Sequence, residues 1–204
     1  MFKPENIENS FFLNIGFNFD PSLLKPGDVL ISEPFLSDPN FSRSVVLIAE
    51  YKPEEGAFGF IINKPTELEI TDIIDELDAN GHIFHQGGPV NTETLFFIHN
   101  KGDVIPNSHL IMDGLWWSGD YEEVVAMINH GIIGQGDVKF FGGYSGWAVG
   151  QLEDEIKSRS WIIGKLGANE ILSHVSETLW KTSLNHLGTK FSIMANFPEN
   201  PELN

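Results

Sequence analysis

Two groups of polar residues have the types and spacing needed to bind a ligand, and the first occupies residues 38–44. Asp38 and Asn40 are short acceptor side chains that can form Asx turns with their own backbone. Arg43 and Ser44 can hold an anion or a carboxylate, because a guanidinium donates paired hydrogen bonds to such groups. The alternative is a rigid, hydrogen-bonded turn in which Arg43 pairs with an internal acid or with backbone carbonyls.

The second group lies in the segment FGGYSGWAVGQLEDEI, residues 141–156. We expect Tyr144 and Trp147 to form one concave wall together with Gln151 and Glu153. The three consecutive acids at 153–155 fall early in an expected helix, where the helix dipole favours negative charge. A solvated helix face is therefore the alternative interpretation of these acids.

The two groups together suggest an enzyme of unrecognised class as one hypothesis. Its pocket would lie between the 38–44 turn and the 142–153 segment. Asn40 and Arg43 would orient the ligand, the two aromatic side chains would supply apolar walls, and Glu153 would act as a base. A single pocket for a small molecule requires these residues to lie close together.

Three further binding candidates come from tight turns between apolar strands. Gly87 and Gly88 follow one expected strand, and Asn63 ends another just before a proline. Turns of this kind present backbone groups and short side chains at the surface. We include Asn63, Gly87 and Gly88 in the candidate site for this reason.

Known catalytic and nucleotide-binding motifs are absent from the sequence. No phosphate loop occurs, and the turn that opens at Gly134 has Lys139 in place of the third glycine of a dinucleotide fingerprint. Ser145 stands between glycines, but Trp147 occupies the position of the second glycine in a nucleophile elbow. We expect Ser145 to cap the following helix.

Metal and cofactor sites are not expected either. The chain has no cysteine, so disulfides and thiolate metal ligands are excluded. His82 and His85 are three residues apart on an expected strand and therefore point to opposite faces. The sequence predicts no metal and no cofactor.

The charge of the chain limits its partners. The 29 acidic and 12 basic residues give a net charge of −17, which opposes binding to nucleic-acid phosphates. No signal peptide is evident, and no apolar run approaches the roughly 20 residues of a membrane span. We expect a cytoplasmic protein without direct nucleic-acid or membrane contacts, whose partner is a protein or a small molecule.

The pattern of elements predicts an α+β protein. Residues 1–26 read as an extension packed on the core, 27–196 as a single domain, and 197–204 as a loose tail. Several strands are joined by short turns, including a hairpin over 44–63, so antiparallel pairs must be present. Helices are expected over 70–78, 121–130, 148–157 and 169–187, and a final strand over 191–195.

Taken together, these segments resemble the AlgH/YqgE family of bacterial proteins. The similar pieces are PFLSDPNFSRSVVLIAE (34–50), GAFGFIINKP (56–65), QGGPV (86–90), TLFFIH (94–99) and GGYSGWAVGQLEDEI (142–156). The resemblance implies a mixed, largely antiparallel sheet that bifurcates and curls into a pseudo-barrel with flanking helices. It also implies a role in transcriptional regulation, because members of the family carry that label. The family has no agreed catalytic residues, cofactor or ligand.

The leading functional hypothesis is a non-enzymatic cytoplasmic regulator or adaptor that binds a protein or a small ligand. Any link to transcription would be indirect, because of the acidic charge. The alternative is the enzyme described above. A third possibility is a contact between copies of the chain through the adjacent Trp116 and Trp117.

Overall fold

The computed structural model describes residues 19–78, 81–173 and 178–198, and it is of the α+β class. The strands are β1 (Asp28–Ser32), β2 (Val45–Lys52), β3 (Gly56–Ile61), β4 (Pro65–Glu69), β5 (Ile83–Gln86), β6 (Val90–His99), β7 (His109–Met112), β8 (Leu115–Trp117), β9 (Val138–Trp147) and β10 (Trp161–Lys165). The helices are η1 (Pro21–Leu23), η2 (Ile70–Asp72), α2 (Tyr121–Asn129), α3 (Gln151–Lys157), α4 (Ala168–Leu172), α5 (Leu179–His186) and α6 (Thr189–Met194).

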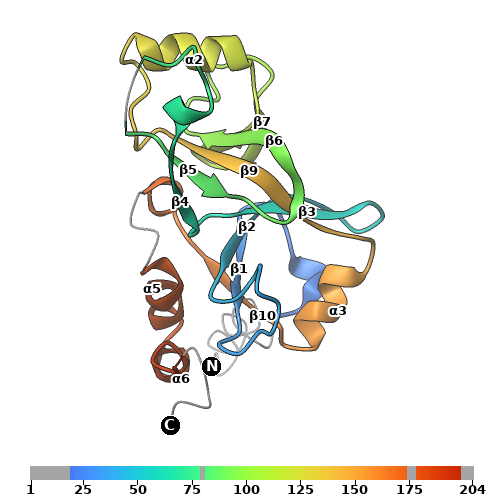
Figure 1. The fold of residues 1–204 in the computed structure, drawn as a ribbon. Helices are drawn as coiled ribbons and strands as arrows, with labels where there is room; N and C mark the ends of the chain where they lie inside the picture. The colour runs from blue at the N-terminus through green and yellow to red at the C-terminus, as the bar shows by residue number, and fades with distance from the viewer. Residues whose placement is uncertain (1–18, 79–80, 174–177, 199–204) are drawn as a thin grey trace, which may run out of the picture.

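One sheet of ten strands runs through the described molecule and forks at β9 (Figure 1). The main path is β10-β1-β2-β3-β9-β6-β8-β7, and β10 and β7 do not pair with each other, so the sheet stays open. One edge of β9 pairs with β6. The other edge pairs in parallel with β5 over residues 140–142 and antiparallel with β3 over residues 145–147. The expected mixed, bifurcated sheet is confirmed.

Gly87 lies at the point where the sheet forks, between β9 and β3. Its N–H donates to the Gly142 carbonyl at 2.9 Å, and its own carbonyl accepts from the N–H of Ile61 at 2.8 Å. A Cβ on Gly87 would lie 2.3 Å from the Gly143 carbonyl oxygen, and one on Gly88 would lie 2.2 Å from the Tyr144 carbonyl carbon. The paired glycines are therefore needed for close backbone approach.

Strands β1 and β2 are apolar nearly throughout because both of their faces are buried. Val45 and Leu47 of β2 point into one hydrophobic cluster, while Val46 and Ile48 point into a second. Helices α4 and α5 cover the first face, and α3 covers the second (Figure 1). This half of the molecule is a three-layer α/β/α arrangement.

A third cluster fills the other end of the molecule beneath α2. Val124 and Ile128 of α2 pack there with Phe97 of β6 and Phe140 of β9. The helix begins at the expected N-cap, where Asp120 Oδ1 accepts from the Glu123 N–H at 3.2 Å. The predicted helix at 121–130 is confirmed.

The described ends of the chain lie against the core. Phe19 and Leu24 are buried in the second cluster, while residues 1–18 of the expected extension lie outside the described residues. Phe197 stacks on Phe35 with ring centroids 5.5 Å apart, and most of the expected tail, 199–204, is likewise not described. No helix within the described part of the chain is long and apolar enough to cross a membrane.

Two helix predictions were too long. Residues 70–78 form only the short helix η2 and a turn, although Ile74 and Leu77 are buried at the expected spacing. So short a segment gains little from helix propagation after the cost of nucleation. The expected helix at 169–187 is split: α4 ends at Leu172, and the next residue, Ser173, has an extended backbone and donates its hydroxyl to the Glu170 carbonyl at 2.9 Å.

Two further local predictions were wrong. Residues 191–195 lie within and just after helix α6, not in a strand, because Gly188 at φ 100° turns the chain so that α6 packs on α5. Ser145 does not cap a helix. It is buried in β9 and donates to the Gly87 carbonyl at 3.2 Å, while the N-cap of α3 is Gly150.

Gly59 gives a direct test of the close packing between β2 and β3. A Cβ at this position would lie 2.1 Å from the Leu47 carbonyl oxygen, so we expect Gly59→Ala to lower the free energy of unfolding by about 1–3 kcal/mol. Urea denaturation measures the change. In Gly136→Ala, the matched control, the new Cβ meets nothing within 4 Å, and its stability should stay equal or rise slightly. Equal effects of the two changes would contradict this account.

Candidate functional site

The 38–44 segment is a hydrogen-bonded turn. Asp38 Oδ1 accepts from the Asn40 N–H at 2.8 Å, which is the expected Asx turn. Lys64 Nζ donates to the Asn40 carbonyl at 2.7 Å, and Ser44 Oγ donates to the Phe41 carbonyl at 2.8 Å. Asn40 and Ser44 thus have structural hydrogen bonds of their own.

The Arg43 side chain contacts α5 and the segment that follows α6. Its Nη2 donates to the Phe197 carbonyl at 2.6 Å, and its guanidinium carbon lies 4.8 Å from the centre of the Trp180 ring. Asn63 holds its backbone, donating to the Arg43 carbonyl at 2.9 Å and accepting from the Val45 N–H at 2.7 Å. Arg43 thus connects the turn to the helical layer, and Asn63 connects it to the start of β2; neither lines the cavity beside Trp147.

Tyr144 and Trp147 do not form one wall. They are three residues apart on β9, so their side chains point to opposite faces of the sheet. Tyr144 packs on the first cluster, with its ring centroid 5.5 Å from that of Phe58. Trp147 belongs to the second cluster. The expectation of a shared wall overlooked the strand periodicity.

Glu153 is also engaged elsewhere. Its Oε1 accepts from the hydroxyl of Tyr51 at 2.7 Å. Burial, followed by this hydrogen bond and the nearby charge of Glu153, raises the pKa of Tyr51 to about 12. Glu153 therefore braces α3 against β2 and is not placed to act as the base of the proposed pocket.

A cavity of about 290 Å³ does lie between the 38–44 turn and the β9–α3 segment. The described residues that line it are Leu36, Asp38, Phe41, Pro89, Gly146, Trp147, Gln151, Glu155, Ser160 and Trp161. Of the sequence candidates it brings together Asp38, Trp147 and Gln151. The other eight lie outside this lining: Asn40, Arg43, Ser44, Asn63, Gly87, Gly88, Tyr144 and Glu153.

The Glu155 carboxylate is the centre of the cavity's polar wall. Its Oε2 accepts from Trp147 Nε1 at 2.9 Å and from Trp161 Nε1 at 2.8 Å. Its Oε1 accepts from Gln151 Nε2 at 2.9 Å. One side chain of α3 thereby joins β9, β10 and its own helix, and it sets the orientation of both indole rings.

Sequence reasoning missed Glu155 and Trp161. Two signals pointed to Glu155: it lies four residues after Gln151, so the two side chains meet on one helix face, and a buried indole N–H needs an acceptor. Trp161 lies after the helix, and the sequence gave no indication that it returns to Trp147, with ring centroids 6.2 Å apart.

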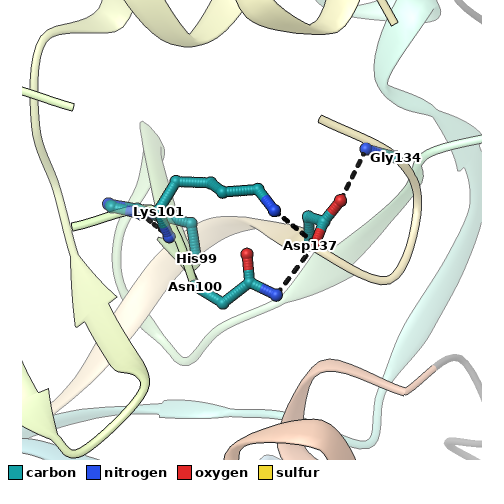
Figure 2. A network of polar contacts seen from close by, with 5 residues as sticks. All are labelled: His99, Asn100, Lys101, Gly134 and Asp137. Atoms are coloured by element: carbon teal, nitrogen blue, oxygen red, sulfur yellow. Dashed lines mark hydrogen bonds and ion pairs between the residues drawn. The ribbon is translucent and has the colours of Figure 1, made fainter. Parts of the chain in front are cut away.

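A second polar cluster surrounds Asp137 beyond the end of β6 (Figure 2). The Asp137 carboxylate accepts from Asn100 Nδ2 at 2.8 Å, Lys101 Nζ at 3.0 Å and the Gly134 N–H at 3.0 Å. Burial raises the pKa of Asp137, but these donors together lower it below its usual value. The three bonds close the loop that leads into β9, which is a structural role.

Lys139 is the buried cation of the described chain. It is 2% exposed, and its Nζ donates to the carbonyls of Ser173 at 2.9 Å and Ile62 at 3.2 Å. Burial lowers the pKa of Lys139 to about 8. Through these two bonds Lys139 links β9 to the end of β3 and to the end of α4. No cluster of three metal-ligating side chains occurs among the described residues.

Trp116 and Trp117 both pack on their own chain. The Trp116 ring covers Gly102, where a Cβ would lie 2.1 Å from the indole. The Trp117 ring lies 4.8 Å from Phe58 and 5.0 Å from His109 between centroids. A contact between copies of the chain through these residues stays a prediction.

Comparison with known proteins shows the family of this chain. A family model described as AlgH-like (DUF179) matches residues 29–192. The chain belongs to this family. A UPF0301 protein of Bacteroides fragilis is 41% identical over 200 residues, covering 98% of this chain and 100% of the relative. A UPF0301 protein of Chlorobaculum tepidum is 39% identical over 182 residues, covering 89% and 97%.

Two solved structures are similar to this AlgH-like chain. The solution structure of AlgH from Pseudomonas aeruginosa is 27% identical with a TM-score of 0.67, covering 88% of this chain and 97% of that one. A crystal structure from Corynebacterium diphtheriae has a TM-score of 0.71 at 21% identity, covering 88% and 95%, and shows the fold alone. None of these names states an activity or a ligand, so function rests on the site.

Replacing Glu155 tests its role as the centre of the polar wall. In Glu155→Gln one end of the side chain becomes a donor, so at least one of the three N–H groups loses its acceptor. We expect the free energy of unfolding to fall by about 1–3 kcal/mol in urea denaturation. Asp154→Asn, which removes only an exposed ion pair with Lys157, should change it by less than about 1 kcal/mol. A neutral Glu155→Gln would argue against this role.

Because His99 is buried, we expect the free energy of unfolding to fall in mild acid. The buried ring accepts the Lys101 N–H at 3.1 Å, so its Nε2–H donates to the Ser118 carbonyl at 2.9 Å. Burial lowers the pKa of His99 from 6.5. As the pH falls below 6.5, the unfolded chain gains a proton that the folded chain refuses, so the free energy of unfolding falls.

The measurement is urea denaturation between pH 7.5 and 5.0. We expect His99→Gln to show a shallower decline with falling pH than the unmodified protein, although its stability at pH 7.5 will be lower. His186→Gln changes an exposed histidine and serves as the control. Parallel declines for all three proteins would show that His99 contributes nothing to the pH dependence.

Proposed function

We propose that this AlgH-like protein is a non-enzymatic regulator or adaptor, which works by binding a small ligand or a group of a partner protein in the cavity beside Glu155. The observation that supports this is the Glu155 carboxylate with its three N–H donors. These bonds hold Trp147 and Trp161 in place before any ligand arrives. A rigid wall of this kind favours binding, because little conformational entropy is lost on association.

The geometry argues against the enzymatic alternative at this cavity. Glu153, the candidate base, bonds Tyr51, and Arg43, the candidate for ligand orientation, bonds the Phe197 carbonyl. Of the two carboxylates that line the cavity, Glu155 already accepts three N–H donors and Asp38 accepts the Asn40 N–H. A general base has to be within reach of the proton that it abstracts and free to accept it, and neither Glu153, the candidate base, nor Glu155 meets both conditions.

The acidic charge bears on the kind of regulation. A net charge of −17 repels nucleic-acid phosphates at long range. We therefore assign any influence on transcription to contacts with other proteins. We also propose that the protein works in the cytoplasm, because a chain without cysteines has no disulfide that reducing conditions would break.

Filling the cavity tests the proposal. Ser160 lines it, whereas Ser158 is an exposed neighbour outside the lining. The melting temperature is measured with a panel of N-acetylated amino-acid amides, cationic, anionic and neutral. We expect at least one to raise it in the unmodified protein and in Ser158→Tyr but not in Ser160→Tyr, because a ligand stabilises only a state that binds it.

Two results would contradict the proposal. If every stabilising amide acts equally on Ser160→Tyr, the cavity is not the binding site. If a bound amide is chemically converted by the unmodified protein and not by Ser160→Tyr, the cavity is catalytic and the enzymatic alternative is correct.

A further inference from the structure

The charge of the cavity lining is wholly negative. Asp38 and Glu155 contribute carboxylates, and no lysine, arginine or histidine is among the described lining residues. A ligand that enters loses much of its hydration, so an anion would meet an uncompensated repulsion. The lining favours a ligand with positive charge.

Both carboxylates keep unused hydrogen-bonding capacity. A carboxylate has about four acceptor sites, and the described donors to Glu155 fill two on Oε2 and one on Oε1. Asp38 Oδ1 takes the Asn40 N–H, while its Oδ2 accepts no hydrogen bond from the described residues. The nearby cation Lys64 donates to the carbonyls of Pro39 and Asn40 instead.

The remaining walls are aromatic. The Phe41 ring lies 6.3 Å from Trp147 and 5.5 Å from Trp161 between centroids. Aromatic faces attract cations, and indole does so most strongly. Between the two types of cation, a planar guanidinium stacks on rings and can donate to two carboxylates at once, which a compact ammonium does less well.

We infer that the cavity binds a guanidinium group on an alkyl chain, the group carried by an arginine side chain. The inference rests on the proposed binding function of this cavity and names the chemical class of its ligand. Carboxylate oxygens of Asp38 and Glu155 receive its N–H groups, and the rings of Phe41, Trp147 and Trp161 cover its apolar stem and its face. The cavity volume of about 290 Å³ is enough for one such side chain.

Calorimetric titration with matched probes tests the inference. N-acetyl-arginine amide should bind, and N-acetyl-citrulline amide, nearly the same shape without the charge, should bind at least roughly tenfold more weakly. Asp38→Asn should weaken arginine binding severalfold without unfolding the protein, since Asp38 is exposed. Asp154→Asn, an acid outside the lining, is the control and should bind as the unmodified protein does.

The source of the guanidinium is separated by two further probes. Agmatine represents a free small molecule, and a five-residue peptide with a central arginine represents a partner protein. Tighter binding of the peptide supports a protein partner, whereas tighter binding of agmatine supports a metabolite, and both support the guanidinium class.

The inference fails if citrulline binds as tightly as arginine, if Asp38→Asn has no more effect than Asp154→Asn, or if neither guanidinium probe binds. The proposed function survives these results as long as another amide in the panel stabilises the unmodified protein and not Ser160→Tyr. The two ideas can therefore be refuted separately.

Discussion

The whole arrangement depends on the backbone contact at the point where one edge of β9 stops pairing with β5 and begins to pair with β3. Gly87 bonds Gly142 on one side of this point and Ile61 on the other, so it joins the two branches of the sheet. Side chains are excluded here because a Cβ on Gly87 would lie 2.3 Å from the Gly143 carbonyl oxygen. Close backbone approach, and not a reactive group, explains the dense glycine segments.

The fork also explains where the cavity forms. Once β9 turns to pair with β3, its last residue, Trp147, faces α3 and the second hydrophobic cluster. Helix α3 then leads into β10, which pairs with β1 at the far end of the sheet path and returns Trp161 to the same place. Glu155 accepts a hydrogen bond from each indole, so its carboxylate connects α3 to β9 and β10.

The rest of the polar residues mostly serve the fold. Arg43, Asn63 and Ser44 secure the turn before β2, Glu153 braces α3 through Tyr51, and Asp137 closes the loop before β9. Each is fully or partly withdrawn from solvent, where an unpaired polar group would be costly. What distinguishes the cavity is that its two carboxylates are not saturated in this way.

The sequence by itself determined the α+β class, the β2–β3 hairpin, the capped helix α2 and the glycine turns, because these follow from local patterns of apolar residues, caps and turn formers. It also marked both sides of the cavity, at residues 38–44 and 142–153. Only the tertiary structure decided which side chains face it. Strand periodicity sent Tyr144 and Trp147 to opposite faces, helix geometry selected Glu155 over Glu153, and long-range pairing of β10 with β1 supplied Trp161. The first two follow from local periodicity that the sequence carries, whereas the return of Trp161 to Trp147 depends on contacts between distant segments, which local patterns do not encode.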